Sequence, residues 1–90
     1  MRIAVLVAMD LRIVVSKKDS KTLVQVDGRL AAEGVPELEK VTRKAGPALC
    51  LDLSGLRLAD DAGIVAIRHL RDSGAAIVGA SPYIKLLLEE

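Results

Sequence analysis

The first third of the chain alternates between short β-branched runs and polar turns. Residues 11–15 form one such run, residues 17–21 form a polar turn, and residues 22–26 form a second run, closed by Asp27 and Gly28. Two strands joined by so short a polar turn should pair antiparallel. The pattern therefore predicts a β-hairpin at the start of the fold.

Helical spacing follows the hairpin. Pro36 suits the first turn of a helix, and Gly46 followed by Pro47 would end it. The apolar positions of this stretch recur at intervals of three, three and four and so share one face: Val35, Leu38, Val41 and Ala45. We expect a helix here with one buried side.

A strand is predicted over residues 48–53, because apolar and other residues alternate along it. Leu49, Leu51 and Leu53 share one face, whereas Cys50 and Asp52 share the other. A carboxylate beside the next helix could accept hydrogen bonds from loop N–H groups. We therefore expect Asp52, with Ser54, to structure the loop that leads to that helix.

A second helix is expected from Asp60 or Asp61, either of which is a good N-cap, to about Ser73, with Gly74 ending it. Residues 75–79 form a short apolar strand. An N-capping serine and a proline at positions 81–82 then start a final helix over residues 83–90.

The resulting order is β-β-α-β-α-β-α, an α/β fold. Strands separated by single helices favour parallel pairing and right-handed crossovers, so the sheet should be small, mixed and mostly parallel. Ninety residues suffice for one domain. We place this single domain at residues 11–90, and residues 1–10 are either an N-terminal extension or an extra strand.

The second helix has two unlike sides. At 100° per residue its sheet-facing side would hold small and apolar residues: Ala62, Gly63, Ala66, Ile67 and Leu70. Ile64 and Val65 should then point away from the sheet, beside Arg68. Two branched apolar residues exposed near an acidic helix start are a candidate contact patch.

Composition narrows the class of function. Thirteen basic and twelve acidic residues give a net charge of +1, and Tyr83 is the one aromatic residue, so a nucleic-acid partner is not expected. The apolar run at residues 3–9 is far shorter than the roughly 20 residues of a membrane helix. A lone cysteine and this absence of a membrane segment fit a cytoplasmic protein.

The sequence contains few residues that could form a catalytic site or a metal site. His69 is the one histidine and Cys50 the one cysteine, and no nucleophile-elbow or phosphate-binding glycine loop accompanies them. Single copies of histidine and cysteine cannot supply a close-spaced metal site. We therefore expect no enzyme, no catalytic residue, no metal and no cofactor.

An ordered set of short segments resembles the STAS domain, the module of anti-sigma factor antagonists and of sulfate transporter tails. The set comprises VQVDGRL at residues 24–30, LDLSGL at 51–56, DDAG at 60–63, Gly74, the strand at 76–79, and Ser81-Pro82 leading into Ile84 and Leu87-Leu88. The resemblance spans about residues 11–90. It implies a STAS-like fold and a protein partner.

The resemblance also assigns a position to each residue of the DDAG segment. The family usually has Asp-Ser-Ser-Gly or Asp-Thr-Ser-Gly there, and the first hydroxyl residue accepts phosphate from a partner kinase. By this correspondence Asp60 and Gly63 match, Asp61 takes the phosphoacceptor place, and Ala62 replaces the second hydroxyl. The chain therefore lacks the phosphoacceptor.

Asp61 has two interpretations. A helix N-terminus stabilises negative charge, and an aspartate brings −1 where a phosphoserine would bring about −1.5 to −2, so Asp61 would partly imitate the phosphorylated form. Alternatively, Asp60 and Asp61 only cap the helix. Both interpretations remain open on the sequence.

The leading hypothesis is a non-enzymatic interaction module that binds an anti-sigma factor or a related serine kinase and so regulates transcription. The partner-binding residues would be Asp60, Asp61, Ala62, Gly63, Ile64, Val65 and Arg68. One alternative is an accessory subunit of a lipid-transport ABC complex that contacts the ATPase. Another is a small-ligand or anion sensor, and a homodimer is compatible with each.

Overall fold

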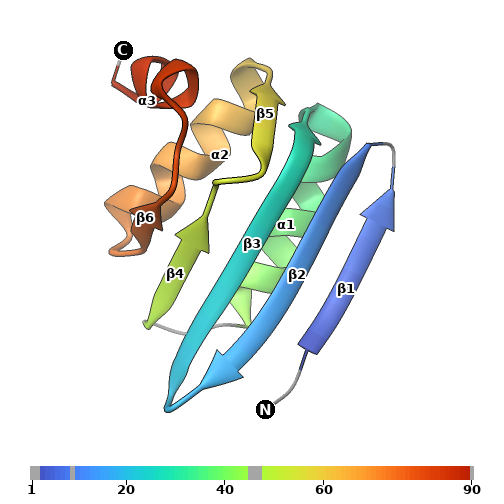
Figure 1. The fold of residues 1–90 in the computed structure, drawn as a ribbon, viewed down its shortest axis with the longest axis vertical. Coiled ribbons are helices and arrows are strands. Elements are labelled where there is room, and N and C mark those ends of the chain that lie inside the picture. Colours follow the sequence, from blue (N-terminus) through green and yellow to red (C-terminus); the bar gives the residue numbers. More distant parts are fainter. Residues whose placement is uncertain (1–2, 9, 45–47, 90) are drawn as a thin grey trace.

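One mixed sheet forms the centre of the molecule. The computed structural model describes residues 3–8, 10–44 and 48–89. Within these ranges the hydrogen-bonded strand order is β1 (Ile3–Ala8), β2 (Leu11–Lys18), β3 (Lys21–Leu30), β4 (Leu49–Asp52) and β6 (Ala76–Val78) (Figure 1). A further strand, β5 (Leu56–Ala59), pairs with β3 outside this path. Strand β2 pairs antiparallel with β1 and with β3. The other pairings are parallel: β3 with β4, β3 with β5, and β4 with β6.

Two helices cover one face of the sheet. A 3-10 turn, η1 (Ala32–Gly34), leads into α1 (Val35–Arg43), and α2 (Asp61–Asp72) follows β5. In Figure 1 both α1 and α2 lie behind the sheet, and the shorter α3 (Pro82–Leu88) lies near β5 and α2. The opposite sheet face has no helix over it in this view.

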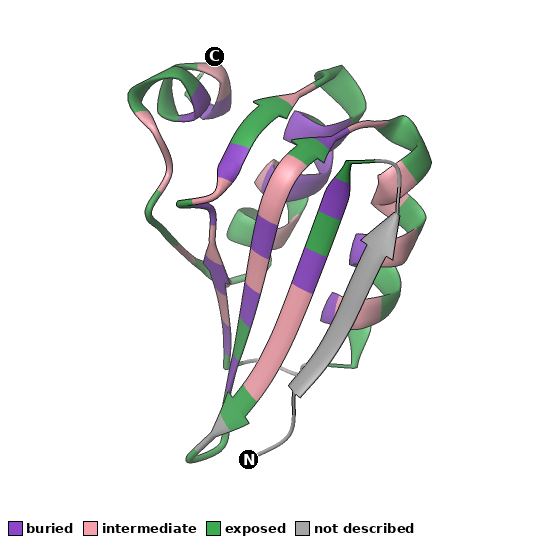
Figure 2. Cartoon of the chain, turned by 45° about the vertical axis from the view of Figure 1, so that its right-hand side comes forward, coloured by how far each residue is buried: buried purple, intermediate pink, exposed green. Residues whose placement is uncertain are grey.

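The core lies between the sheet and these helices. Burial alternates along the central strands, as Figure 2 shows, because successive side chains point to opposite faces. The buried cluster is made of aliphatic side chains from every described layer: Leu11, Ile13, Val24, Val26, Leu30, Leu38, Leu49, Leu51, Leu53, Leu56, Ile64, Ile67, Ile84 and Leu88. The α/β fold is thus held by packed branched aliphatic residues rather than by aromatic ones.

The expected β-β-α-β-α-β-α order is matched approximately, since strands β1 and β5 are added to it. The expected hairpin is present, but its second strand ends later than the sequence predicts. Strand β3 does not stop at Asp27 and Gly28 but runs to Leu30. Gly28 has a φ of +91°, and a Cβ there would overlap the carbonyl oxygen of Asp10. The register with β5 shifts between Gly28 and Arg29, so the glycine bends the strand at a bulge and does not end it.

Strand β5 is not among the strands expected from the sequence. Arg57 is a residue of this strand. The strand expected at 75–79 is limited to Ala76–Val78, and the final helix ends at Leu88. Helix α1 ends at Arg43. Ala45, expected on its buried face, and Gly46 and Pro47, expected to end it, lie outside the described residues.

The N-terminal ten residues contain β1, which pairs antiparallel with β2 from Ile3 opposite Ser16 to Ala8 opposite Leu11. The strand therefore extends the sheet beyond the hairpin.

None of the described helices is both long enough and apolar enough to cross a membrane.

Candidate interaction site at the start of α2

Asp60 is the N-cap of α2 and connects two segments that are distant in sequence. Its Oδ1 accepts a hydrogen bond from the N–H of Gly63 at 2.9 Å, and its Oδ2 accepts one from the N–H of Ala32 at 3.0 Å. Its own N–H donates to the carbonyl oxygen of Leu30 at 3.1 Å. The expected capping role is confirmed and falls to Asp60 rather than to Asp61.

These contacts also determine the ionisation of Asp60. The hydrogen bond from Gly63 lowers the pKa of this carboxyl most, and the bond from Ala32 lowers it further. The positive charge of Arg29 acts in the same direction, whereas partial removal of water raises the pKa, and the net shift is downward. The side chain is therefore held as a carboxylate whose oxygens are already engaged.

Asp61 is in a different situation one residue later. It is the first residue of α2, and it is exposed. Among the described residues no hydrogen bond or ion pair involves its side chain. The two acidic residues therefore differ in role. Asp60 binds backbone N–H groups of two segments, whereas Asp61 presents a free carboxylate to solvent at the positive end of a helix.

Gly63 permits α2 to approach the end of β3 closely. A Cβ at this position would lie 2.5 Å from the carbonyl oxygen of Leu30 and 3.1 Å from its Cγ. Gly63 is buried, so it has a packing role and contributes no side chain to an outer surface. Together with the Asp60 hydrogen bonds, this contact fixes how α2 is rotated against the sheet.

That rotation corrects two predictions about the helix faces. Ile64, which was expected to point away from the sheet, is 7% exposed and belongs to the core. Ala62, which was expected to face the sheet, is exposed. Val65 is 46% exposed, as expected. The buried side runs through Gly63, Ile64, Ala66 and Ile67, so the contact patch proposed from the sequence loses Ile64.

The outer side of α2 forms a continuous stripe. Asp61 and Val65 are four residues apart, Ala62 and Val65 are three apart, and His69 follows Val65 by four, so they are neighbours on the helix surface. All four side chains are exposed. We refer to Asp61, Ala62, Val65 and His69 as the α2 stripe. His69 is not among the contact residues expected from the sequence.

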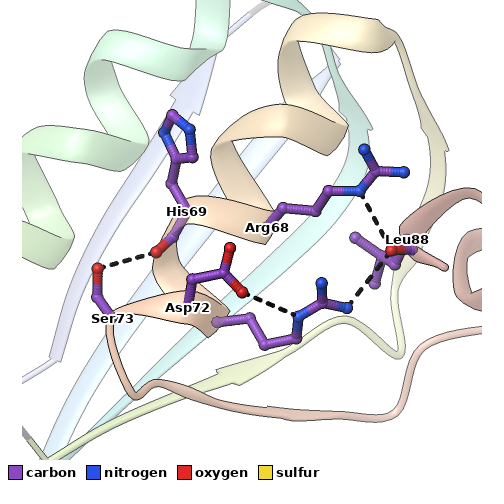
Figure 3. Close-up of polar contacts among 6 residues, drawn as sticks. Arg68, His69, Asp72, Ser73 and Leu88 are labelled. Carbon is purple, nitrogen blue, oxygen red and sulfur yellow. Dashed lines mark hydrogen bonds and ion pairs between the residues drawn. The ribbon is translucent and has the colours of Figure 1, made fainter. Parts of the chain in front are cut away.

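Arg68 was a predicted contact residue, but its donors are used inside the molecule. Its Nη2 donates to the carbonyl oxygen of Leu87 at 2.7 Å, and its Nε donates to that of Leu88 at 3.1 Å. Figure 3 shows this side chain reaching Leu88, while the ring of His69 points away from α3. Arg68 therefore satisfies carbonyls at the end of α3 that have no partner within the helix.

Asp52 and Ser54 form the turn that follows β4. The Oδ1 of Asp52 accepts hydrogen bonds from the N–H of Ser54 at 2.9 Å and from its hydroxyl at 2.7 Å. The carboxylate therefore orders the chain two residues ahead and makes no described bond to the Asp60 loop.

Two further residues lie near the site, although the sequence did not place them there. Arg29, in β3, acts on the carboxyl of Asp60, and Leu58, in β5, is 54% exposed three residues before Asp61. The alternation in LRLA places Leu58 on the same side of a strand as Leu56, which is buried, so the sequence carries no signal that Leu58 is exposed.

Comparisons with known proteins support the fold. No family model matches the chain, and no curated protein matches it in sequence. Among solved structures, it resembles an anti-sigma factor antagonist, a STAS domain from Rhodobacter sphaeroides, with a TM-score of 0.59 and 22% sequence identity. The likeness covers 78% of this chain and 90% of that chain. The STAS-like fold expected from the sequence is confirmed.

Proposed function

We propose that this protein is a non-enzymatic interaction module that binds an anti-sigma factor of the serine-kinase class and so regulates transcription in the cytoplasm. The binding surface is the α2 stripe. The observation on which the proposal chiefly rests is the free carboxylate of Asp61, exposed at the first residue of α2 beside the engaged carboxylate of Asp60.

The fold supports this class of function. The structural neighbour is named as an anti-sigma factor antagonist, and its likeness extends over most of both chains. The α2 stripe combines one charge, one small residue and one branched apolar residue within a turn of helix, a mixture suited to a protein surface.

Asp61 indicates which form of an antagonist the partner would recognise. By the resemblance, Asp61 stands at the place of the phosphoacceptor, and it brings a carboxylate there without phosphate transfer. A partner that recognises the phosphorylated form of an antagonist would bind it without prior phosphate transfer. A kinase would find no hydroxyl to phosphorylate at residues 60–63.

Affinity measurements with charge variants of the full chain test this function. The wild-type protein is titrated with purified anti-sigma factors of the serine-kinase class from the same cell, and binding is followed by calorimetry. We expect Asp61→Lys to weaken binding by about tenfold or more, because it reverses the charge of the one acidic residue in the α2 stripe. Glu39→Lys is the matched control, since Glu39 is an exposed acidic residue on α1.

Two results would reject the proposal. If no anti-sigma factor binds the folded wild-type chain, the partner class is wrong, and an ABC-transporter ATPase is the next partner to titrate. If an anti-sigma factor binds but Asp61→Lys and Glu39→Lys weaken it equally, the α2 stripe is not the contact. Circular dichroism of each variant confirms that the charge changes leave the fold intact.

A further inference from the structure

A groove lies at the other end of α2 from Asp61. It has a volume of about 350 Å³ and is bordered by the end of α2, by β6 with the segment after it, and by α3. The lining residues used below are Arg71, Ile77, Gly79, Lys85, Leu88 and Glu89. Ten residues separate Asp61 from Arg71, which corresponds to about 15 Å along a helix. The groove is thus separate from the start of the α2 stripe.

Arg71 contributes a guanidinium with donors to spare. Its Nη1 lies 3.4 Å from the carbonyl oxygen of Leu88, and its Nε lies 3.7 Å from Oδ1 of Asp72. Both distances are long, whereas Arg68 binds the same end of α3 at 2.7 and 3.1 Å. Because a guanidinium has five N–H donors, Arg71 can turn a fork of two toward a carboxylate without releasing α3.

Lys85 adds a second positive charge from the opposite wall. Its side chain is exposed, and among the described residues it makes no hydrogen bond or ion pair. Glu89, the C-cap residue of α3, follows it by four residues, yet no ion pair joins them within 4.0 Å. Two cations and one carboxylate therefore face the groove, which favours a ligand with one negative charge over a polyanion.

The floor of the groove is apolar. Ile77 is half-buried against the core, and Leu88 is 6% exposed and belongs to it. Gly79 adds backbone without a side chain. An aliphatic body resting on the half-buried Ile77 would remove apolar surface from water on both molecules, and the buried Leu88 closes the floor beside it. The size is at the lower end of ligand pockets, which is suitable for a small molecule only.

We propose that this groove binds a small amphipathic monoanion, a carboxylic acid with a short aliphatic body. The carboxylate lies between Arg71 and Lys85, and the body lies on Ile77 beside Leu88. The domain would then have a second binding site, for a small molecule, apart from the surface proposed for the protein partner. The proposal does not depend on the partner, because it uses residues outside the α2 stripe.

Hexanoate is the probe, and the full chain labelled with ¹⁵N is the receptor. We expect saturable shifts of the amide signals of Ile77, Gly79 and Leu88, with a dissociation constant in the roughly millimolar range that suits so few ligand atoms. Hexanamide lacks the charge, and acetate lacks the aliphatic body. Each should bind about tenfold more weakly than hexanoate.

Charge-removing variants locate the site. Lys85→Gln and Arg71→Gln should each weaken hexanoate binding about five- to tenfold, because each removes one charged donor. Lys40→Gln and Arg43→Gln are matched controls on α1, outside the groove lining, and should leave affinity unchanged. Lys85→Gln is the decisive variant, since an exposed side chain without described contacts can be changed without unfolding the chain.

The proposal is overturned if hexanoate produces no saturable shift, or if the shifts lie outside the groove. It is equally overturned if acetate binds as tightly as hexanoate, since the apolar floor then has no part. Equal affinity of Lys85→Gln and Lys40→Gln for hexanoate would also reject it. Selective loss of affinity in Lys85→Gln, with hexanamide binding about tenfold more weakly than hexanoate, supports it.

Discussion

The carboxylate of Asp60 accepts a hydrogen bond from the N–H of Ala32 at 3.0 Å, across 28 residues of sequence. The other oxygen of the same group caps α2. One side chain thus joins the segment after β3 to the start of α2, and this shared role leads to the first two predictions.

Replacing Asp60 by Ala should lower the melting temperature by several degrees, because two backbone N–H groups lose their acceptor at once. Asp61→Ala is the matched control, as Asp61 is the neighbouring acidic residue without a described contact. Thermal unfolding followed by circular dichroism measures both. Equal melting temperatures for the two variants would show that Asp60 does not hold the segments together.

The contribution of Asp60 should depend on pH in the acid range. Its pKa in the folded protein is lower than in an unfolded chain, mainly through the hydrogen bonds from Gly63 and Ala32. The folded state therefore binds this proton less readily, and the stabilisation is complete above about pH 4, the ordinary range of an aspartate. It is lost as pH falls through the lower folded pKa.

Urea unfolding of the wild type and of Asp60→Asn, repeated at a series of acid pH values, measures this effect. The difference in the free energy of unfolding should be constant near neutrality and should shrink as the pH falls below the ordinary range of an aspartate. A difference that stays unchanged over this whole range would contradict the assignment of the lowered pKa to Asp60.

Gly63→Ala should destabilise the fold by about 1–3 kcal/mol, because the added methyl meets the backbone carbonyl of Leu30, which cannot move aside. Gly34→Ala is the control. Its Cβ would meet Cδ2 of Leu11, the far end of a flexible side chain, so its cost should be smaller. Chemical denaturation of both variants gives the comparison, and a larger loss at Gly34 would reverse the interpretation.

The corrected rotation of α2 can be tested with two neighbouring residues. Ile64→Ala should cost about 2–5 kcal/mol because it opens a cavity in the core, whereas Val65→Ala should change stability by no more than about 0.5 kcal/mol. Urea unfolding curves provide both values. Similar losses at the two positions would mean that α2 is rotated differently.

Arg68→Gln should loosen α3 and cost about 1–3 kcal/mol, because two charge-assisted hydrogen bonds to Leu87 and Leu88 are lost. Amide hydrogen exchange should accelerate in α3 before it accelerates in β3. Arg57→Gln is the control, since Arg57 is exposed and has no described contact. If both variants leave α3 equally protected, the carbonyl contacts of Arg68 contribute nothing.

Local patterns in the sequence were sufficient to predict most of the fold. Period-two alternation predicted β4, the turn at residues 17–21 predicted the hairpin, and capping residues predicted α2 and α3. Each of these signals lies within a few residues of the element that it describes. This is why the element order could be obtained without knowledge of tertiary contacts.

What the sequence could not supply depends on distant contacts. Strand β5 is a strand because it pairs with the last residues of β3, about thirty positions earlier. Ile64 is buried because Gly63 sits against Leu30, and helical periodicity alone allowed the other rotation. Arg68 is occupied by carbonyls that lie 19 and 20 residues later.

Strand β3 has a consequence for how the molecule unfolds. It pairs with β2 from the first half of the chain and with both β4 and β5 from the second half. Neither half encloses the buried cluster, because residues such as Val24 and Leu51 come from opposite sides of this boundary. A chain cut between α1 and β4 would therefore leave two pieces without a core of their own. Loss of structure should be a single cooperative transition, and neither half should melt before the other.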